Sequence, residues 1–368
     1  MKKIVHLSTA HDIGDDRITL RQAGSLANSG FDVTVIARSD PTFRIENRFE
    51  NLKFITFPEW KSRADRLIRG NLLAFFYSVK SKSYLVHIHD PELIPLALIL
   101  RIMGKKIVLD MHEDLAKQVI DKTYLPLFLR RILYVVIPKI LIIVSKFFSA
   151  VIAATESISQ NFPKESVSVI RNLPRLSEFK TDKNYADTPL VVVTGAITRE
   201  RCIYEILEAF SMLENIDLVL AGPIPSKEDS DYLMKHKLFG TRVKYLGIIT
   251  RQDVISLLSR AWIGLSLYKP NPNHLEARPA KLYEYFASET AVLASNFPDW
   301  ETLVLENGAG EVVDPINARD ISLKIKEMVH DKSRLVNYGS KGLSMVTDKF
   351  TWEKEEEVLL RLYEKLAT

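Results

Sequence analysis

The chain has 368 residues, of which 46% are hydrophobic and 26% are charged. This composition is ordinary for a globular protein and excludes long disordered tracts, and the length predicts two domains. The net charge of +4 is too small a surplus for a general nucleic-acid binder. The single cysteine, Cys202, excludes an intrachain disulfide and a cysteine-based zinc site.

The positive charge is concentrated in the first half of the chain. Residues 1–185 hold 28 basic and 19 acidic side chains, whereas the remainder holds 22 and 27. The first half is therefore the part suited to an anionic partner or surface. At the N-terminus two lysines precede only a short apolar run, which lacks the length and the cleavage site of a signal peptide. We therefore expect a buried strand there and a cytoplasmic protein.

Short runs rich in β-branched residues alternate with longer amphipathic segments along the whole chain. The strands expected in the first half are 3–7, 32–37, 52–57, 84–88, 106–109, 150–153 and 167–170. Those expected in the second half are 190–194, 216–220, 243–246, 262–267, 291–294 and 311–313. Helices are expected at 16–29, 201–213, 251–259 and 279–288, among others. Several strands are apolar on both faces, which is typical of parallel strands covered by helices on each side. The pattern predicts two doubly wound α/β domains.

The domain boundary is expected in the polar segment 176–189, which has no periodicity and ends at a proline before the apolar run at 190–194. We place the domains at 1–182 and 183–350. Because ligands of open α/β sheets bind beyond the carboxyl ends of the strands, two such sheets predict a shared cleft.

Several familiar motifs are absent. No strand is followed by G-x-G-x-x-G and no P-loop occurs, which disfavours a dinucleotide enzyme and a P-loop NTPase. Asp229 and Asp231 resemble a metal motif, but the start of a solvated helix explains them better. His87 and His89 lie on one strand face with nothing nearby to complete a metal site. We expect both histidines in the core or at the edge of a cleft.

The informative stretch is 273–298, in which Glu276 and Glu284 are separated by seven residues. A helix that starts near Pro279 would place Lys281 in its first turn, where free N–H groups and the helix dipole favour an anion. Glu284 would follow one turn later, where a carboxylate can accept hydrogen bonds from the hydroxyl groups of a ribose. An exposed helix with a Lys–Glu pair is an equally good interpretation of the spacing alone.

At this point the sequence resembles a known family. The E-x7-E pattern within P-x-K-L-x-E-Y resembles the nucleotide-sugar site of retaining glycosyltransferases of family 4, which have the GT-B fold. Other segments resemble the family in the same order: Asp16-Arg17, His89–Glu92, Asp110–Glu113, Arg171–Pro174, Gly195–Arg201 and Phe350–Trp352. The resemblance implies two Rossmann-like doubly wound domains facing a central cleft. It also implies that a C-terminal helix, 351–368, crosses back to the first domain.

The resemblance implies a donor site on the second domain. Glu284 would hold the ribose of the donor, and Arg201 and Lys281 would neutralise its diphosphate. Arg199 would assist them from a position that is not standard in the family. The loop at Gly14 would approach the diphosphate from the first domain.

The resemblance also implies catalytic and acceptor residues. His112 and Glu276 would contact the transferred sugar, and Asp16 and Arg17 would lie near the acceptor. His112 as a core histidine, and Asp16-Arg17 as a surface ion pair or helix cap, stay open as alternatives. The family needs no metal and no cofactor, because the nucleotide-diphosphate sugar is a substrate. The acceptor would be a glycan or a lipid-linked intermediate of surface polysaccharide synthesis.

This chain departs from the family at several positions of the site. Cys202 and Glu289 stand where glycine is usual, Ala196 stands where arginine is frequent, and only Gly14 is present where a glycine pair is common. These changes bear on the site more than on the fold. A sugar-nucleotide epimerase or hydrolase of the same fold, and a non-catalytic sugar-nucleotide-binding protein, therefore stay open as alternatives.

One segment of the first half suggests a membrane surface. Residues 122–155 contain no Asp or Glu, and their uncharged runs are too short to span a bilayer. One side of the expected helix carries Arg131, Lys139 and Lys146, and another carries Leu133, Val136, Ile140, Ile143 and Phe147. Residues 124–149 therefore predict a helix on an anionic membrane, which would make the protein peripheral at the inner membrane face. An amphipathic helix packed on the sheet of the first domain is the alternative.

Overall fold

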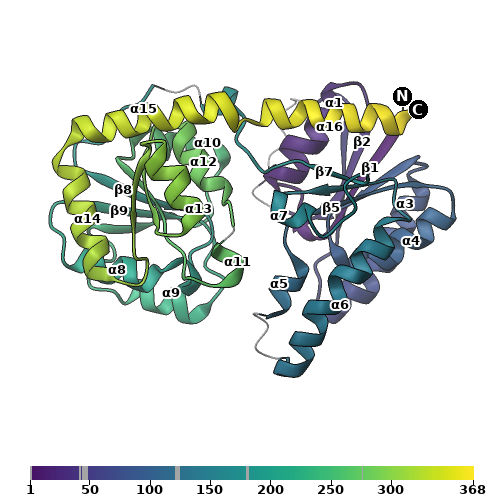
Figure 1. The fold of residues 1–368 in the computed structure, drawn as a ribbon, viewed down its shortest axis with the longest axis horizontal. Coiled ribbons are helices and arrows are strands. Elements are labelled where there is room, and N and C mark those ends of the chain that lie inside the picture. The colour runs from purple at the N-terminus through teal and green to yellow at the C-terminus, as the bar shows by residue number, and fades with distance from the viewer. Residues whose placement is uncertain (1, 41–42, 44–48, 121–124, 180–181, 276) are drawn as a thin grey trace. The chain divides into compact units, whose positions relative to one another are not determined.

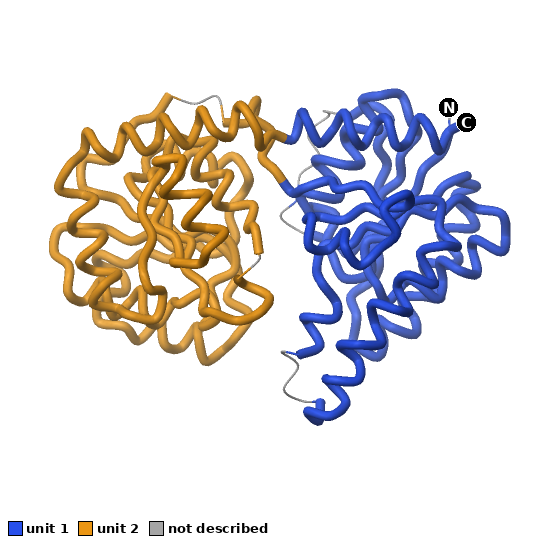
Figure 2. The backbone as a smooth tube through the Cα atoms, viewed as in Figure 1, with its two compact units in different colours: residues 1–172, 352–368 blue, residues 173–351 orange. Residues whose placement is uncertain are grey.

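The computed structural model describes residues 2–40, 43, 49–120, 125–179, 182–275 and 277–368. The chain forms two compact units (Figure 2): unit 1 comprises 1–172 and 352–368, and unit 2 comprises 173–351. The boundary thus lies at 172/173, where the sequence suggested 182/183. The polar segment that follows is held to unit 2, because Phe179 is buried in the core of that unit and Lys183 Nζ donates to the Leu258 carbonyl at 2.8 Å.

Unit 1 is built on a seven-stranded parallel sheet in the order β3-β2-β1-β4-β5-β6-β7 (Figure 1). The strands are β1 (Lys3–Asp12), β2 (Asp32–Arg38), β3 (Leu52–Phe57), β4 (Leu85–Ile88), β5 (Lys106–Met111), β6 (Ala150–Ala153) and β7 (Val167–Val169). All seven were predicted, and β1 continues five residues beyond its predicted end. That extension carries polar side chains that belong to the candidate site.

Helices cover both faces of this sheet. The helical turn η1 (Asp16–Ala23), α1 (Gly24–Asn28) and α16 (Trp352–Ala367) share one core, and α3 (Asn71–Lys80), α4 (Ile94–Ile102) and α6 (Leu127–Ser145) share the other. The shorter helical elements are α2 (Arg63–Asp65), η2 (Arg66–Gly70), η3 (Pro91–Leu93), α5 (Leu115–Ile120) and α7 (Glu156–Ser159). The C-terminal helix α16 belongs to unit 1: Trp352 is fully buried there and donates to Ser25 Oγ at 3.0 Å.

Unit 2 has a six-stranded parallel sheet in the order β10-β9-β8-β11-β12-β13. Its strands are β8 (Leu190–Thr194), β9 (Asp217–Ala221), β10 (Val243–Tyr245), β11 (Ile263–Ser266), β12 (Ala291–Ser295) and β13 (Gly310–Val313). Its helices are η4 (Leu176–Phe179), η5 (Arg199–Arg201), α8 (Ile203–Ser211), α9 (Lys227–Met234), α10 (Arg251–Arg260), α11 (Pro272–Leu275), α12 (Ala280–Ala287), α13 (Pro298–Glu301), η6 (Thr302–Glu306), α14 (Ala318–His330) and α15 (Lys332–Lys349). The chain reverses direction across the sheet between β8 and β11, which is where doubly wound sheets bind ligands.

Among the residues described, no helix is long and apolar enough to cross a membrane.

The end of α3 supplies a test of backbone strain. Lys82 follows the cap residue of this helix with a φ of +52°, a left-handed conformation that glycine adopts without steric cost. Lys82→Gly is expected to stabilise the protein by about 0.5–1 kcal/mol, because the relief of strain exceeds the extra entropy of the unfolded chain. Lys80→Gly, two residues earlier in the regular helix, is expected to destabilise by about 1 kcal/mol. Urea unfolding of both variants measures the two effects, and equal signs would contradict this explanation.

Candidate functional sites

In unit 2, the loops that follow neighbouring strands touch through their backbones. Gly195 follows β8 with a φ of +89°, and Gly222 follows β9 with a φ of +145°. A Cβ atom on Gly222 would overlap the Gly195 carbonyl, so only glycine permits this approach. Gly222 N–H donates to the Gly247 carbonyl at 2.7 Å, and Tyr245 Oη donates to the Gly222 carbonyl at 2.9 Å. The carboxyl edge of the sheet is therefore a tightly joined set of loops.

Two cationic side chains converge beside these loops. Arg201 Cζ lies 5.2 Å and Lys281 Nζ lies 4.9 Å from the centre of the Tyr268 ring, just after β11. Arg201 Nη1 donates to the Ala196 carbonyl at 3.1 Å. Neither cation has a carboxylate partner within the described part of the chain. Burial, reinforced by the charge of Arg201, holds the pKa of Lys281 well below its ordinary value. An anion bound between the two cations would offset both the burial of the Lys281 amine and the repulsion between the two positive charges.

The helix α12 positions Lys281 as the sequence predicted. It begins at Ala280 after Pro279, so Lys281 lies in its first turn and Glu284 one turn later, both buried. The Glu284 carboxylate accepts a hydrogen bond of 2.6 Å from Arg251 Nη1, at the start of α10. Arg251 also forms an ion pair with Glu178 at 3.0 Å. A ribose bound by Glu284 must therefore share this carboxylate with Arg251, a partner that no motif in the sequence indicated.

The structure does not bring Arg199 to this pair of cations. Its side chain is 59% exposed, lies 5.1 Å from the Tyr204 ring and approaches Glu228 at 3.7 Å. Its backbone N–H is held by the Asp229 carboxylate at 3.1 Å. Asp229 lies in the first turn of α9, as the sequence suggested, but it is buried rather than solvated and fixes the backbone at η5.

Two departures from the family pattern have a conformational counterpart. Cys202 and Glu289 have φ values of +57° and +53°, the left-handed region that favours glycine. Both positions thus have the backbone conformation that favours glycine, although neither residue is a glycine. Cys202 is fully buried next to Arg201, and burial raises the pKa of its thiol to about 12, which makes it unreactive.

Four histidines of unit 1 gather near the carboxyl ends of the central strands: His6, His87, His89 and His112. His6 on β1 lies opposite His87 on β4, and His89 follows two residues later on the same face. His6 Nδ1 and His89 Nε2 are 3.0 Å apart, and His87 Nδ1 lies 2.6 Å from Tyr363 Oη on α16. Burial holds the pKa of His6 and His87 well below the ordinary value and lowers that of His89 to about 3. These three imidazoles are neutral core groups, as expected for His87 and His89.

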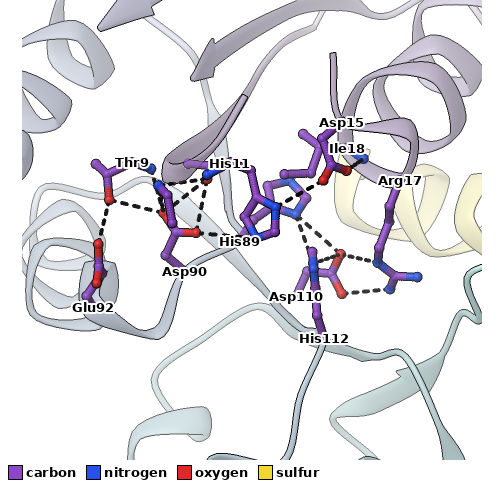
Figure 3. Close-up of polar contacts among 12 residues, drawn as sticks. Thr9, His11, Asp15, Arg17, Ile18, His89, Asp90, Glu92, Asp110 and His112 are labelled. Atoms are coloured by element: carbon purple, nitrogen blue, oxygen red, sulfur yellow. Dashed lines mark hydrogen bonds and ion pairs between the residues drawn. The ribbon is translucent and has the colours of Figure 1, made fainter. Parts of the chain in front are cut away.

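A buried carboxylate organises the polar end of this cluster (Figure 3). Asp110 on β5 accepts two hydrogen bonds from Arg17, at 2.8 and 3.0 Å, and one from Gln22 at 2.7 Å. His112 Nε2 lies 2.9 Å and His89 Nδ1 lies 3.3 Å from the same carboxylate. Although burial opposes it, the Arg17 charge together with these imidazoles holds the pKa of Asp110 well below its ordinary value.

These contacts define what Arg17 and His112 can do. Arg17 is buried and its charge is matched by Asp110. Asp16-Arg17 is therefore neither the surface ion pair nor the helix cap that was considered from the sequence. His112 is partly exposed, and an Nε2–H donated to Asp110 leaves Nδ1 as its hydrogen-bond acceptor. Sequence reasoning named Asp110 only as part of a motif and gave it no role.

The loop after β1 brings a further histidine to His112. The Asp90 carboxylate accepts hydrogen bonds from the backbone N–H groups of Thr9 and Ala10, which shapes this loop. The His11 ring lies 5.4 Å from the His112 ring, and His11 Nδ1 lies 3.0 Å from Asp15. Asp15 also caps η1 through the Ile18 N–H, so the cap is Asp15 rather than Asp16, which falls in the first turn.

Two predicted site residues remain, Gly14 and Glu276. Gly14 lies in the loop after β1 and its Cα faces Asp40 and Phe43, so a side chain there would meet both. Glu276 lies outside the described residues, and its catalytic role stays a prediction.

Among the residues that the structure describes, two groups of side chains have donor atoms within 4.8 Å of one another, as a metal site would require: His6, His87 and His89, and His89, Asp110 and His112. In the first group, hydrogen bonds with each other and with Tyr363 occupy one nitrogen of each ring. In the second, Arg17 lies 2.8 Å from Asp110 and would repel a divalent cation. Hydrogen bonding explains both groups better than metal binding does.

His11 provides a test of the charges in this loop. Burial acts against protonation, but the hydrogen bond and charge of Asp15, with Asp90 and Glu113 nearby, raise the pKa of His11 to about 9. An NMR titration is expected to show His11 protonated at neutral pH, and Asp15→Asn should return its pKa toward about 6.5. Because the folded-state pKa is raised, this pair stabilises the fold below about pH 6.5 and loses that effect as the pH rises to about 9. A His11 midpoint near 6.5 in the unmodified protein would contradict the assignment.

The comparisons with known proteins bear first on unit 2. Residues 175–345 match the family model described as glycosyl transferases group 1. The chain carries a glycosyl transferases group 1 domain. This domain coincides with unit 2, which spans 173–351. It contains the Arg201–Lys281 pair, Glu284 and Arg251.

The chain also has a distant curated relative. The chain is 22% identical over 197 residues to the capsular polysaccharide biosynthesis glycosyltransferase CapM of Staphylococcus aureus, which covers 49% of this chain and 48% of CapM. The match thus spans about half the length of that relative.

The whole chain resembles several solved structures. Sucrose-phosphate synthase from Thermosynechococcus elongatus has a TM-score of 0.77 at 20% identity, covering 100% of this chain and 99% of that one. A glycosyltransferase from Rickettsia africae has 0.74 at 16% identity, with coverage of 100% and 99%. Anabaena HepE in complex with UDP and glucose has 0.74 at 14% identity, with coverage of 100% for both chains. At these identities the likeness shows the fold, and the predicted GT-B architecture of two parallel-sheet α/β domains is confirmed.

Proposed function

We propose that the protein is a retaining glycosyltransferase that moves a hexosyl group from a nucleotide-diphosphate sugar to an acceptor. The observation that carries this proposal is the convergence of Arg201 and Lys281 on Tyr268 at the first turn of α12. When the bond to the sugar breaks, negative charge grows on the departing diphosphate, and preorganised cations stabilise it. HepE, which shares the fold, was solved with UDP-glucose, and this supports a donor of the same class.

In this proposal the donor is held by unit 2. Arg201 and Lys281 bind the diphosphate, and Glu284 binds the ribose hydroxyl groups while Arg251 fixes the direction of its carboxylate. The base contacts the loops after β9 and β10, where Leu246 and Ile248 expose apolar side chains. We assign Arg199 no direct role, because its side chain is engaged with Tyr204 and Glu228.

Unit 1 supplies the acceptor side of the proposed reaction. His112 contacts the transferred sugar, and Asp110 is its positioning residue because it fixes which nitrogen of the imidazole carries the proton. Arg17 acts through Asp110, whereas Asp16 and the Gly14 loop contact the acceptor and the diphosphate. Glu276 retains the catalytic role that the sequence predicts. Since the cations are Arg201 and Lys281, the proposed reaction needs neither a metal ion nor a cofactor.

We propose a glycan or a lipid-linked intermediate of surface polysaccharide synthesis as the acceptor. The name of CapM supports this class of pathway. The basic helix α6, which carries no acidic residue, suits a protein that meets such an acceptor at the inner face of a membrane.

The proposal is tested by incubating the purified protein with UDP-, GDP- and ADP-sugars, with and without a lipid-linked acceptor, in the presence of EDTA. We expect release of one nucleoside diphosphate that depends on the acceptor and is insensitive to EDTA. NMR of the product is expected to show the anomeric configuration of the donor. Conversion to an epimer without acceptor would favour an epimerase, and donor binding without turnover would favour a non-catalytic binder.

A further inference from the structure

The helix α3 of unit 1 exposes an apolar stripe. Ile68, Leu72, Phe76 and Val79 follow one another at helical spacing through η2 and α3, and Ile68 and Leu72 are 68% and 67% exposed. The opposite side of the helix contributes Ala74 to the core. Surface helices of globular proteins usually present charged or polar residues on the side that faces water, so an exposed apolar stripe of this kind suits contact with a partner or a membrane.

The helix α6 exposes a second apolar surface. It packs on the sheet through Leu141 and Ser145, both buried. The packing of this helix on the sheet, which was the alternative considered from the sequence, is thus present. The side that contains Val136, Ile140, Ile143 and Phe147 is largely exposed. The core takes up only a narrow strip of the helix.

The helix α4 lies with these two over the same face of the sheet (Figure 1). It contacts α3, and Arg101 Nε on α4 donates to the Phe147 carbonyl at the end of α6 at 3.0 Å. Its C-terminal end exposes Ile99, Ile102 and Met103, and Ile102 is 87% exposed. The apolar stripes of α3, α4 and α6 thus lie on one side of unit 1.

Basic side chains predominate around these stripes. Residues 94–109 and 122–155 contain basic side chains but no Asp or Glu. On the α3 side, Asp65 forms an ion pair with Arg69 at 3.5 Å, and Glu92 forms one with Arg66 at 2.9 Å. A second copy of the same face would bring its cations against these cations, which disfavours a symmetric dimer. Apolar side chains flanked by an excess of Lys and Arg fit the surface of an anionic bilayer.

We propose that α3, α4 and α6 form one docking face that inserts its apolar side chains into an anionic membrane surface. This extends the contact proposed for α6 to three helices, and in that respect it rests on the proposed function. The face lies on unit 1, whereas the nucleotide site proposed above is built from residues of unit 2. Membrane binding and nucleotide binding can therefore be measured independently.

The test uses the full-length protein and vesicles of roughly three parts phosphatidylcholine to one part phosphatidylglycerol, with pure phosphatidylcholine vesicles as a comparison. The variants are Leu72→Glu/Phe76→Glu on α3, Ile102→Glu on α4 and Ile140→Glu/Ile143→Glu on α6. Leu323→Glu on α14 of unit 2 is the matched control, since Leu323 is an equally exposed helical residue. Co-sedimentation gives the partition coefficient, and circular dichroism and UDP binding verify that each variant is folded.

We expect the unmodified protein to bind the anionic vesicles and not the pure phosphatidylcholine vesicles, and salt should weaken this binding. Each face variant should reduce the partition coefficient about tenfold or more, whereas the control should leave it unchanged. Any of three outcomes would overturn the proposal. The first is that the α3 and α4 variants partition like the unmodified protein, which would leave α6 as the sole contact. The second is that the unmodified protein does not bind anionic vesicles, and the third is that sedimentation shows a dimer that the face variants dissociate. Failure to bind any of UDP, GDP and ADP with vesicle binding intact would count against the proposed function and not against this face.

Discussion

Replacement of Lys281 by methionine is expected to weaken the binding of a nucleoside diphosphate about 10- to 150-fold while it raises the thermal midpoint of the free protein. Hydrogen bonds from a cation to an ionised group contribute about 1.5–3 kcal/mol, which sets the loss of affinity. The gain in stability has a separate cause. In the free protein, burial and the charge of Arg201 both disfavour the protonated amine of Lys281. Methionine fills a similar volume without a charge and removes that cost.

The opposite signs of these two effects distinguish a binding residue from a structural one. Calorimetric titration with the preferred diphosphate and a thermal melt measure them on the same sample. Arg199→Ala is the matched control, because Arg199 is a cation of the same domain whose side chain is engaged elsewhere. Unchanged affinity in Lys281→Met, or an equal loss in Arg199→Ala, would refute the assignment.

The same site predicts a pH dependence of binding. The pKa of Lys281 is lowered in the free protein, and a bound diphosphate would raise it by adding opposite charge. Between these two pKa values the complex holds more protons than the free protein, so binding takes up protons and affinity falls as the pH rises. Titrations in buffers with different ionisation enthalpies report the proton uptake, which should vanish in Lys281→Met.

Replacement of Asp110 by alanine is expected to destabilise the protein by about 3–5 kcal/mol, the largest change in stability that the structure predicts. The substitution leaves the guanidinium of Arg17 buried without its counter-charge, and it removes the acceptor for Gln22 and His112. Urea unfolding measures the loss. Glu357→Ala, which breaks an exposed pair with Arg361 on α16, should change stability by less than about 1 kcal/mol.

A second set of variants separates the structural and functional roles of Asp110. Arg17→Met/Asp110→Leu removes both charges and should recover most of the stability lost by Asp110→Ala. Asp110→Asn preserves the shape but no longer fixes the proton on His112. It is therefore expected to lower kcat and to shift the acid limb of the pH–rate profile, with little effect on donor affinity. A kcat and pH profile equal to those of the unmodified protein would contradict the positioning role.

The sequence predicted the fold well, because strands buried on both faces leave a strong local pattern. The strands of both sheets appeared in the periodicity, and the start of α12 followed from Pro279 and the run after it. Placing Arg201 and Lys281 together depended on the resemblance to the glycosyltransferase family, because the spacing of the residues alone fitted an exposed helix with a Lys–Glu pair equally well.

Partners joined only by the tertiary fold could not be predicted. Arg251 reaches Glu284 because α10 begins beside α12, a contact between segments 33 residues apart that leaves no trace in either motif. Arg199 and Arg201 are two residues apart, yet they diverge because the turn between β8 and α8 directs their side chains to different neighbours. The sequence left open whether α6 packs on the sheet or lies on a membrane for a related reason, since an apolar helix does not reveal which of its apolar rows meets the core.

The most direct test of the central claim compares a nucleoside diphosphate with its parent nucleoside. The claim is that Arg201 and Lys281 bind the diphosphate of a nucleotide sugar. Titration of the unmodified protein with UDP, GDP and ADP should identify one ligand that binds about 100-fold or more tightly than its nucleoside. That difference should largely disappear in Arg201→Met/Lys281→Met. A nucleoside that binds as well as its diphosphate, or a difference that survives in the double variant, would contradict the claim.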